Sequence, residues 1–378
     1  MNILEVCLSP SFGGLEIHMR DFSRWLAARE GAKLHLAVLD NSRIDQSLRD
    51  LGSPTLRFTS PAGAFPLGKA RRLAHFIDEA GIDVLHVHWK DDLPLAALAK
   101  RMARQRLRLV HTRQMSLPGR KFDPYHRMIY RSVDCFIAIT RLIAVQAEKN
   151  LPIPPEKLCQ IYYGVQVPEL EAGRSAGIRR ELGLEGKFVV GVIGRVTEPK
   201  GQHLLVEAIE ILRSEGIPAV GLVVGEPFEK PYVERLTSMI RERKLAEHIR
   251  FMPFHPKPDE IMSACDVVAL TTKAETFGLV LVEAMQCGVA VVGSNAEGVP
   301  EIIDDAKTGL LFEPWDAASL ASALRRLFSD PALRRRLAEE GMRKARSNFA
   351  AGVQYEKFYA ALRGDVSLAL LEEHRLDP

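Results

Sequence analysis

The sequence of 378 residues is long enough for two α/β domains of under about two hundred residues each, and its 47% apolar and 26% charged residues exclude a disordered or fibrous protein. It holds no apolar run near the roughly eighteen residues that a membrane-spanning helix needs, and it begins on a strand pattern without a basic signal-peptide start, so we expect a cytoplasmic protein. The five cysteines are odd in number and far apart, which predicts reduced thiols rather than a disulfide framework or a zinc site. The net charge of +3 is too small to indicate a class of binding partner by itself.

The first half of the sequence alternates apolar runs with helical patterns. Strands are predicted at residues 3–7, 33–39, 84–88, 107–113, 133–139 and 158–162, with helices up to about residue 29 and over residues 141–150. Gly13 and Gly14, between the first strand and its helix, allow backbone amides to approach a ligand closely, although any tight turn between a strand and a helix can use such a pair.

The strand predicted at residues 84–88 ends in a His-x-His pair. Alternation along a strand places His86 and His88 on one face, which makes a metal site conceivable. No third ligand is nearby, so we expect no metal site here. The following strand also ends in a histidine, His111, directly before Thr112.

Positive charge is concentrated in the stretch from residue 100 to residue 131. This stretch contains one acidic residue, Asp123, and ten basic residues. The basic residues are Lys100, Arg101, Arg104, Arg106, Arg108, Arg113, Arg120, Lys121, Arg127 and Arg131. One interpretation is a solvated face with a few ligand contacts, and the other is a surface that faces anionic lipid or an acidic acceptor.

The second half repeats the alternation of strands and helices after a predicted linker at residues 166–185. Strands are predicted at residues 188–193, 220–224 and from 249, with a further one at 266–270, and helices at 202–213, 232–243, 317–328 and 331–348. Arg195 and Lys200 lie between the first of these strands and its helix. Paired cations before a helix N-terminus suit phosphate groups.

Two glutamates bracket a Phe-Gly pair directly after the apolar run at 266–270. If a helix begins near Gly278, its unpaired amides form a phosphate site, with Glu275 beside it and Glu283 where ribose hydroxyls would be bonded. The alternative interpretation is two ordinary surface glutamates, one on a loop and one on a helix.

This Glu-x7-Glu pattern, followed by Gly298 to Ile303 and by Thr308 to Phe312, closely resembles the retaining nucleotide-sugar glycosyltransferases of family 4, group 1. The resemblance implies the α/β fold called GT-B, in which two Rossmann-like domains face each other across a cleft and a C-terminal helix crosses back to the first domain. The implied parts are an acceptor domain at residues 1–165, a linker at 166–185, a donor domain at 186–348, a crossover helix at 349–364 and a tail at 365–378.

The resemblance also implies roles for particular residues. The expected catalytic residues are His111, Arg195, Lys200 and Glu275. The expected donor-binding residues are Gly14, Arg195, Lys200, Phe254, Glu275, Phe277, Gly278, Leu279 and Glu283. The expected acceptor or membrane side holds Arg113, Arg120, Lys121 and Arg127, and no metal ligand is expected.

The implied reaction moves a hexose-type sugar from a nucleotide-sugar to a glycan or lipid-linked acceptor with retention of configuration. The leaving diphosphate would be neutralised by protein cations and a helix N-terminus, since the sequence lacks an Asp-x-Asp metal motif, and no cofactor is expected. We expect peripheral contact with the anionic inner face of the cytoplasmic membrane, a role in bacterial polysaccharide or lipopolysaccharide synthesis, and no nucleic-acid partner.

Two alternatives remain, a nucleotide-sugar epimerase and a catalytically silent, nucleotide-binding scaffold subunit. A dinucleotide oxidoreductase lacks support because no Gly-x-Gly-x-x-Gly follows a strand. One departure from the family pattern is Tyr163, which precedes Gly164 where the family usually carries an asparagine, so any hinge contact of that asparagine is in doubt.

Overall fold

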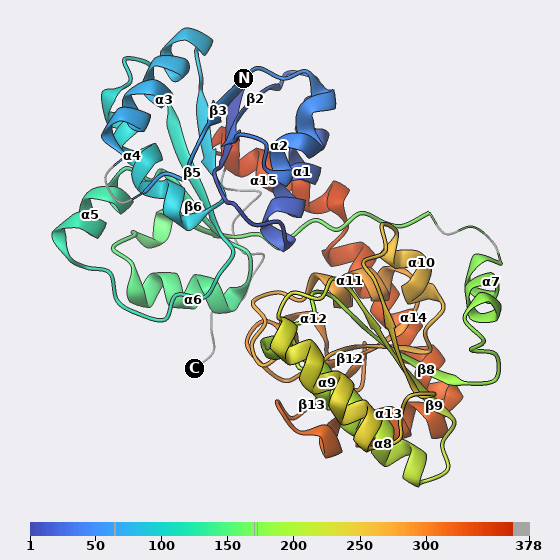
Figure 1. Cartoon of the computed structure of the whole chain (residues 1–378). Coiled ribbons are helices and arrows are strands. Elements are labelled where there is room, and N and C mark those ends of the chain that lie inside the picture. The colour runs from blue at the N-terminus through green and yellow to red at the C-terminus, as the bar shows by residue number, and fades with distance from the viewer. Residues whose placement is uncertain (64–65, 170, 172, 366–378) are drawn as a thin grey trace. The chain divides into compact units, whose positions relative to one another are not determined.

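The computed structural model describes residues 1–63, 66–169, 171 and 173–365 (Figure 1). The chain forms two compact α/β units. Unit 1 comprises Met1–Gly164 and the chain from Gly352 onward, and unit 2 comprises Val165–Ala351. Most of the tail expected at 365–378 lies outside the described residues.

Unit 1 is built on a seven-stranded parallel sheet in the order β3-β2-β1-β4-β5-β6-β7. Its strands are β1 (Asn2–Cys7), β2 (Lys33–Leu39), β3 (Thr55–Phe58), β4 (Val84–Val87), β5 (Arg108–Arg113), β6 (Cys135–Ala138) and β7 (Leu158–Gln160). The strand order reverses between β1 and β4. The loops after these two strands therefore part to opposite faces of the sheet and leave a crevice at its carboxyl edge.

The helices of unit 1 cover both faces of this sheet, as expected of a parallel sheet whose strands are apolar on both sides. They are α1 (Gly14–Ala27), α2 (Arg43–Leu48), α3 (Leu67–Ala80), α4 (Leu93–Met102), α5 (Pro124–Arg131), α6 (Arg141–Asn150) and α15 (Ala351–Arg363). Side-chain oxygens of Ser42, Asp123 and Thr140 accept hydrogen bonds from backbone amides in the first turns of α2, α5 and α6, which fixes where these helices begin.

α15 confirms the predicted C-terminal helix that crosses back to the first domain. Tyr355 and Phe358 are fully buried and pack with their rings 5.3 and 5.5 Å from that of Phe22 on α1. The Tyr355 hydroxyl donates to the carbonyl oxygen of Gly164 at 3.3 Å. Residues from opposite ends of the sequence thus share one core.

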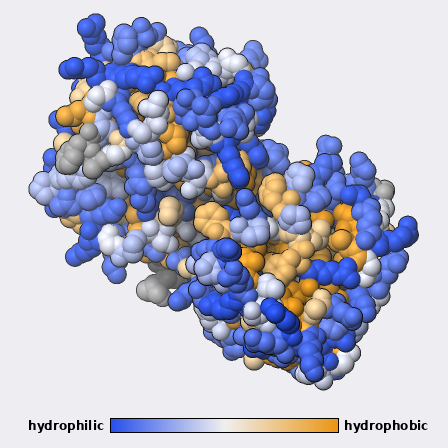
Figure 2. Space-filling model, in the orientation of Figure 1, coloured by the Kyte–Doolittle hydropathy of each residue, from blue (hydrophilic) through white to orange (hydrophobic). Residues whose placement is uncertain are grey.

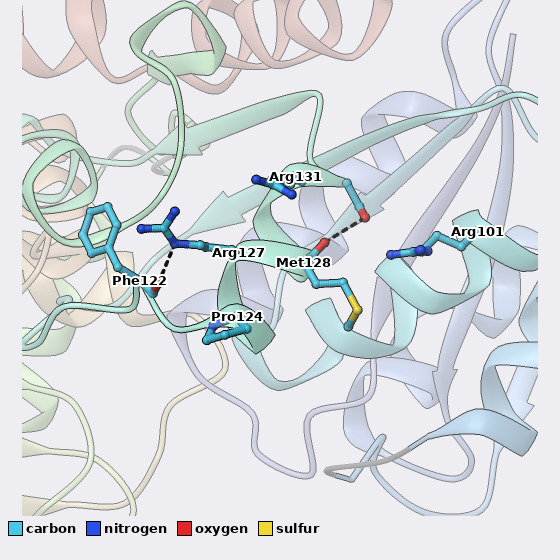
Figure 3. A pocket seen from close by; sticks show the side chains of 7 residues that line it. Arg101, Phe122, Pro124, Arg127, Met128 and Arg131 are labelled. Atoms are coloured by element: carbon cyan, nitrogen blue, oxygen red, sulfur yellow. Dashed lines mark hydrogen bonds between the residues drawn. The ribbon is translucent and has the colours of Figure 1, made fainter.

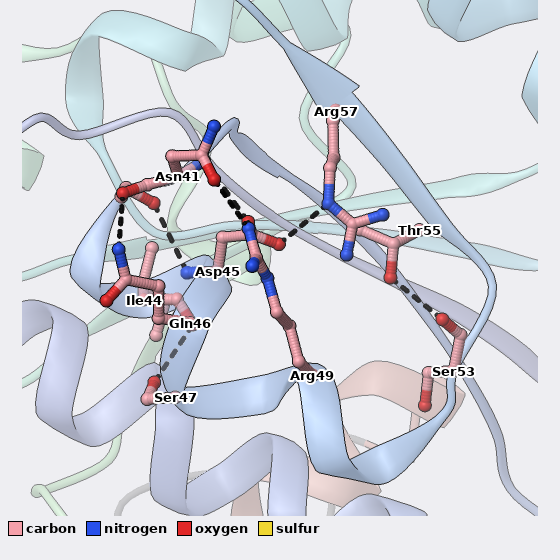
Figure 4. Close-up of polar contacts among 10 residues, drawn as sticks. Asn41, Ile44, Asp45, Gln46, Ser47, Arg49, Ser53, Thr55 and Arg57 are labelled. Atoms are coloured by element: carbon pink, nitrogen blue, oxygen red, sulfur yellow. Dashed lines mark hydrogen bonds and ion pairs between the residues drawn. The ribbon is translucent and has the colours of Figure 1, made fainter.

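The edge strand β3 and helices α2 and α3 occupy a region that the sequence analysis left largely unassigned. Asp45 ties α2 to this edge because its buried carboxylate accepts hydrogen bonds from Arg49 Nη2 at 2.6 Å and from Arg57 Nε on β3 at 2.9 Å (Figure 4). Burial raises the pKa of Asp45, but these bonds and one from the Asn41 amide bring it below its ordinary value. The carboxylate is therefore ionised and paired.

Unit 2 holds a six-stranded parallel sheet in the order β10-β9-β8-β11-β12-β13. Its strands are β8 (Phe188–Ile193), β9 (Ala219–Val224), β10 (Ile249–Met252), β11 (Val267–Leu270), β12 (Ala290–Ser294) and β13 (Leu310–Phe312). Its helices are α7 (Arg174–Glu181), α8 (Gln202–Ser214), α9 (Lys230–Glu242), α10 (Pro258–Ser263), α11 (Leu279–Gln286), α12 (Val299–Ile302), α13 (Ala317–Ser329) and α14 (Pro331–Asn348). Here the strand order reverses between β8 and β11.

The stretch expected to be a linker is partly helical. Within residues 166–185, α7 is bound to the rest of unit 2 by an ion pair between Arg174 Nε and Glu260 Oε2 at 2.8 Å and a hydrogen bond from Ser175 Oγ to the Ser263 carbonyl at 2.7 Å. The expectation of a linker over the whole stretch is thus corrected.

The two chain segments at the ends of unit 2 lie side by side. The Val165 amide donates to the Phe349 carbonyl at 2.8 Å, and the Ala351 amide donates to the Val165 carbonyl at 2.9 Å. These bonds form an isolated parallel bridge between Val165 and Ala350. The chain therefore enters and leaves unit 2 at one place.

The described part of the chain includes no helix both long and apolar enough to span a bilayer. Figure 2 shows hydrophilic residues over most of the visible surface, interrupted by apolar patches.

Candidate active site

The loops that follow β8 and β11 are joined to each other at the carboxyl edge of the unit 2 sheet. The Thr271 hydroxyl donates to the Lys200 carbonyl at 2.7 Å, and the Lys273 amide donates to the Pro199 carbonyl at 3.0 Å. Gly201 allows this approach, since its φ is +68° and a Cβ there would lie 2.2 Å from the Thr271 carbonyl oxygen. This junction lies at the switch in strand order, where open α/β sheets bind ligands.

Lys200 and Glu275, which the sequence analysis assigned to separate contacts, form an ion pair in the structure. Lys200 Nζ lies 2.6 Å from Glu275 Oε2, and the two side chains are 33% and 21% exposed. A pair this accessible to water contributes at most about 1 kcal/mol to folding. Its charges remain available to a ligand that competes for either partner.

Arg195 supplies a second cation near the same edge. Its side chain is exposed and its guanidinium lies 5.2 Å from the centre of the Phe228 ring. Gln202 Nε2 donates to the Arg195 carbonyl at 2.9 Å, which fixes the backbone at this position. No ion pair of Arg195 occurs among the described residues. Its charge is therefore free to meet an anion.

The helix expected near Gly278 is α11, and Gly278 is its N-cap residue with a φ of +95°. This left-handed conformation is accessible to glycine without a penalty. The segment is fixed from the opposite side by Gly298, whose amide donates to the Glu275 carbonyl at 2.9 Å and whose added Cβ would lie 2.0 Å from the Thr276 carbonyl oxygen. The dipole of α11 favours an anion at this end, where the Leu281 amide already donates to the Gly278 carbonyl at 2.9 Å and the preceding amides of Leu279 and Val280 lie in the first turn.

The remaining donor-side residues differ in exposure. Glu283 lies half-buried on α11, four residues beyond Leu279. The Phe277 side chain is buried, with its ring 5.8 Å from that of Phe349, so only its backbone could face a ligand. Phe254 follows β10 and is 70% exposed. It is therefore free to stack on a planar group.

His111 of unit 1 is a fully buried, neutral imidazole. Burial and the neighbouring Arg113 guanidinium lower the pKa of His111 to about 3. Its Nδ1 lies 3.1 Å from the Val87 carbonyl oxygen, which assigns the proton to Nδ1. Nε2 has no hydrogen-bond partner in the described structure and is left as an acceptor.

Two family models match the chain. The model described as Glycosyltransferase Family 4 matches residues 12–167, and the model described as Glycosyl transferases group 1 matches residues 176–344. The chain belongs to glycosyltransferase family 4, group 1. Membership confirms the family that the Glu-x7-Glu pattern predicted.

The names of two relatives in sequence mention L-malate and D-inositol 3-phosphate. N-acetyl-alpha-D-glucosaminyl L-malate synthase of Bacillus anthracis is 25% identical over 315 residues, covering 80% of this chain and 81% of that protein. D-inositol 3-phosphate glycosyltransferase of Nocardia farcinica is 30% identical over 259 residues, or 66% of this chain and 54% of that protein. The chain thus spans about half the length of the second relative.

Solved structures confirm the GT-B fold. HepE of Anabaena in complex with UDP has a TM-score of 0.86 at 23% identity, with 96% of this chain and 100% of that chain covered. WaaG, a glycosyltransferase involved in lipopolysaccharide biosynthesis, has a TM-score of 0.70 at 18% identity, with 96% and 100% covered. At these identities the similarity establishes architecture alone.

The Gly-Gly turn of the glycosyltransferase begins α1, and Gly14 is the first residue of that helix. The amide of Gly13 is already bonded, since it donates to Glu16 Oε2 at 2.8 Å. Glu16 therefore closes the turn in a manner that the sequence analysis missed, although a glutamate three residues after the N-cap residue, here Gly13, is a recognisable capping signal.

The residues expected on the acceptor or membrane side do not all lie at the surface. Arg113 is buried and donates through Nε to the Met115 carbonyl at 2.7 Å and through Nη2 to the Ser116 carbonyl at 2.8 Å. It holds the loop after β5 and is not part of an exposed basic surface, which corrects that expectation. Arg120 is exposed and its guanidinium lies 5.7 Å from the Phe122 ring.

Two cavities in unit 1 are lined by some of the other basic residues of this stretch. A cavity of about 650 Å³ is lined by Arg101, Phe122, Pro124, Arg127, Met128, Arg131 and Ser132 (Figure 3). Three of these side chains are guanidinium groups and none is acidic. Lys121 lines a second cavity of about 470 Å³ together with Lys90, Asp91 and Tyr125. The sequence analysis named Arg127 for this surface and passed over Arg101 and Arg131 as individual residues.

The statement that no third ligand lies near the His-x-His pair is wrong. Glu5 on β1 lies between His86 and His88, with Oε1 at 3.0 Å from His86 Nδ1 and Oε2 hydrogen-bonded to His88 Nε2. The parallel register pairs Glu5 with His86 across adjacent strands. A separation of 81 residues in the sequence hid this contact.

Proposed function

We propose that the chain is a retaining, nucleotide-sugar-dependent hexosyltransferase whose donor binds at the carboxyl edge of the unit 2 sheet. The observation that carries this proposal is the Lys200–Glu275 ion pair at 2.6 Å beside the start of α11. It unites a cation for a diphosphate, a carboxylate for sugar hydroxyls and a helix N-terminus at one junction. The free guanidinium of Arg195 adds the second positive charge that a departing diphosphate requires.

In the proposed reaction, the bond from the anomeric carbon to the diphosphate oxygen breaks while the acceptor hydroxyl attacks on the same face. The acceptor proton passes to the departing phosphate oxygen, so no protein base is assigned. Lys200 and Arg195 stabilise the charge that develops on the diphosphate. Glu275 and the backbone from Phe277 hold sugar hydroxyls.

Two further groups are assigned by the family pattern. Glu283 on α11 accepts hydrogen bonds from the ribose hydroxyls. His111 is assigned to the donor sugar by the family pattern alone; in the structure its imidazole is neutral and fully buried, and its Nε2 has no partner among the described residues. The low pKa of His111 keeps the imidazole neutral throughout the physiological pH range.

We propose that the transfer step needs no metal ion because protein groups supply the positive charge. HepE structures contain UDP and UDP-glucose, which makes UDP-sugars the first donors to test. GDP- and ADP-sugars complete the panel, since the backbone and Phe254 near the end of β10 do not identify the base.

For the acceptor we propose a glycan or lipid-linked molecule that carries negative charge, handled at the anionic inner face of the cytoplasmic membrane. The support is the cavity lined by Arg101, Arg127 and Arg131, whose lining contains no acidic residue and includes the partly exposed ring of Phe122. Cationic side chains beside exposed apolar ones favour an anionic membrane surface. Such a location suits a step in polysaccharide or lipopolysaccharide synthesis.

The test is a donor panel with the purified full chain in EDTA, scored by thermal stabilisation and by release of the nucleoside diphosphate. We expect one nucleotide to respond. We expect Lys200→Ala to weaken the response strongly, while substitution of Lys230, an exposed lysine on α9 of the same unit, by alanine leaves it unchanged. The anomeric configuration of the product, read by NMR coupling constants, tests retention. Binding without release would favour a silent scaffold, and no response to any donor would refute the proposal.

A further inference from the structure

Where the strand order of unit 1 reverses, the adjacent strands β1 and β4 carry a cluster of three buried residues of the types that bind metals. Glu5 comes from β1, His86 from β4 and His88 from the residue directly after β4. All three side chains are completely shielded from solvent. One ligand atom from each can be chosen so that all three lie within 4.8 Å of one another.

The spacing of these atoms is close to that of ligands around one ion. His86 Nδ1 and Glu5 Oε1 are 3.0 Å apart, and His88 Nε2 lies against the other carboxylate oxygen. Ligands at about 2.0 Å from a tetrahedral ion are separated by roughly 3.3 Å. Both contacts are shorter than this separation, so the ligand atoms would move apart slightly to admit an ion.

Each histidine is also oriented by a polar group on its far side. His86 Nε2 lies 2.7 Å from Thr112 Oγ1, which can accept a hydrogen bond from the Nε2–H group while Nδ1 faces Glu5. His88 Nδ1 lies 3.5 Å from Gln114 Nε2, and Gln114 Oε1 is buried without a partner in the described structure. Rotation of the Gln114 amide by 180° brings that oxygen to His88 Nδ1–H. Such outer partners are a regular feature of histidines that ligate metals.

A second buried carboxylate acts on this cluster. The buried carboxylate of Glu5 is joined by that of Glu16, which is 4% exposed and close enough to act on His88 electrostatically. The neighbouring ring of His18, centred 6.2 Å from that of His88, is buried with both nitrogens unpartnered among the described residues. A divalent cation would balance the two carboxylates.

We propose that Glu5, His86 and His88 bind one transition-metal ion of the zinc type. Imidazole nitrogens with one carboxylate suit Zn²⁺ and related ions, whereas Mg²⁺ and Ca²⁺ prefer oxygen ligands alone. The ion joins β1 to β4 beneath α15, whose Phe358 ring lies 6.4 Å from that of His86. Its role is structural, and it takes no part in the proposed transfer.

The proposal is tested without donor or acceptor, so its outcome is independent of the proposed function. The full chain, freed of any histidine tag, is purified and its metal content measured, then stripped with chelator and titrated with Zn²⁺ and with Co²⁺. We expect one equivalent of metal per chain, the visible absorption of a tetrahedral Co²⁺ complex, and a rise in Tm of roughly 5 °C or more at a hundredfold excess of free Zn²⁺ over its Kd.

Glu5→Gln and His88→Gln are expected to lose the Co²⁺ spectrum and the Tm response. His35→Gln is the matched control, because His35 is a buried histidine on the adjacent strand β2 and lies outside the cluster. If the variants fail to fold, the stripped wild-type chain still decides the question. If the wild-type chain shows neither a Tm shift nor a Co²⁺ spectrum, hydrogen bonds alone join Glu5 to the two histidines. If Glu5→Gln binds the metal as tightly as the wild-type chain does, the metal lies elsewhere. Either result overturns the proposal.

Discussion

Replacement of Lys200 by alanine is expected to separate catalysis from stability. The ion pair with Glu275 is a third exposed on the lysine side, so its loss lowers the free energy of unfolding by no more than about 1 kcal/mol. The same substitution removes a charge-assisted contact with the leaving diphosphate, for which we expect a loss of about 2 to 4 kcal/mol of transition-state stabilisation. The expected fall in kcat/KM is therefore about 30- to 1000-fold, with a change in Tm of only a few degrees.

The pairing itself makes a second, opposite prediction for Glu275→Gln. In the unliganded chain Glu275 competes with phosphate for Lys200, so removal of its charge frees the ammonium group. We expect Glu275→Gln to bind the nucleoside diphosphate more tightly, by calorimetry, while its transfer rate falls because sugar hydroxyls lose an acceptor. Lys230→Ala serves as the control for a lost surface lysine. Wild-type kcat/KM in Lys200→Ala, or weaker diphosphate binding by Glu275→Gln, would refute the reasoning.

Three further predictions concern stability and binding. Burial raises the pKa of Asp92 to about 7, whereas the same carboxyl group titrates near pH 4 in the unfolded chain, so the folded state loses stability as the pH rises from about 4 to 7. We expect Asp92→Asn to raise the free energy of unfolding at pH 8 by about 2 to 4 kcal/mol and to flatten its pH dependence, and an unchanged denaturation profile would contradict this. In a urea titration, Gly298→Ala should lower the free energy of unfolding by about 1 to 3 kcal/mol, because the new Cβ would lie 2.0 Å from a carbonyl oxygen, and it should also reduce sugar transfer. Gly352→Ala on α15 is the control: its new Cβ would have nothing within 4 Å, so the substitution should be neutral or slightly stabilising in the same titration. Joint replacement of Arg101 and Arg131 by alanine should weaken the salt-sensitive binding of the chain to phosphatidylglycerol vesicles at least tenfold in a flotation assay. If vesicle binding does not change with the double substitution, or does not change with salt concentration, this cavity has no role in membrane contact.

The buried strands were the part of the fold that the sequence revealed most directly. The predicted strands at residues 33–39 and 188–193 have the same bounds as β2 and β8, since each is a short apolar run between breakers. The long amphipathic pattern at 331–348 likewise matches α14. β3 and α7 were missed because one is a short edge strand and the other is a polar helix with a single buried residue, Ile178.

The composition of the candidate site was predicted more fully than its internal contacts. Lys200 and Glu275 were both named from local motifs, yet their pairing depends on the adjacency of β8 and β11, which no local pattern states. Glu5 escaped notice for the same reason, because its partners lie on β4. Arg113 was taken for a surface residue, and only the course of the loop after β5 shows that carbonyl groups enclose its guanidinium.

The position of α15 in the sequence has a consequence for synthesis on the ribosome. Its rings of Tyr355 and Phe358 complete the core around Phe22, but the whole of unit 2, residues 165–351, is translated before them. Unit 2 begins and ends at one hydrogen-bonded bridge, so it can fold as soon as its last strand and helices have left the ribosome. In unit 1, by contrast, the apolar side of α1 stays exposed until α15 has been translated. That surface is therefore the natural target for a chaperone during translation.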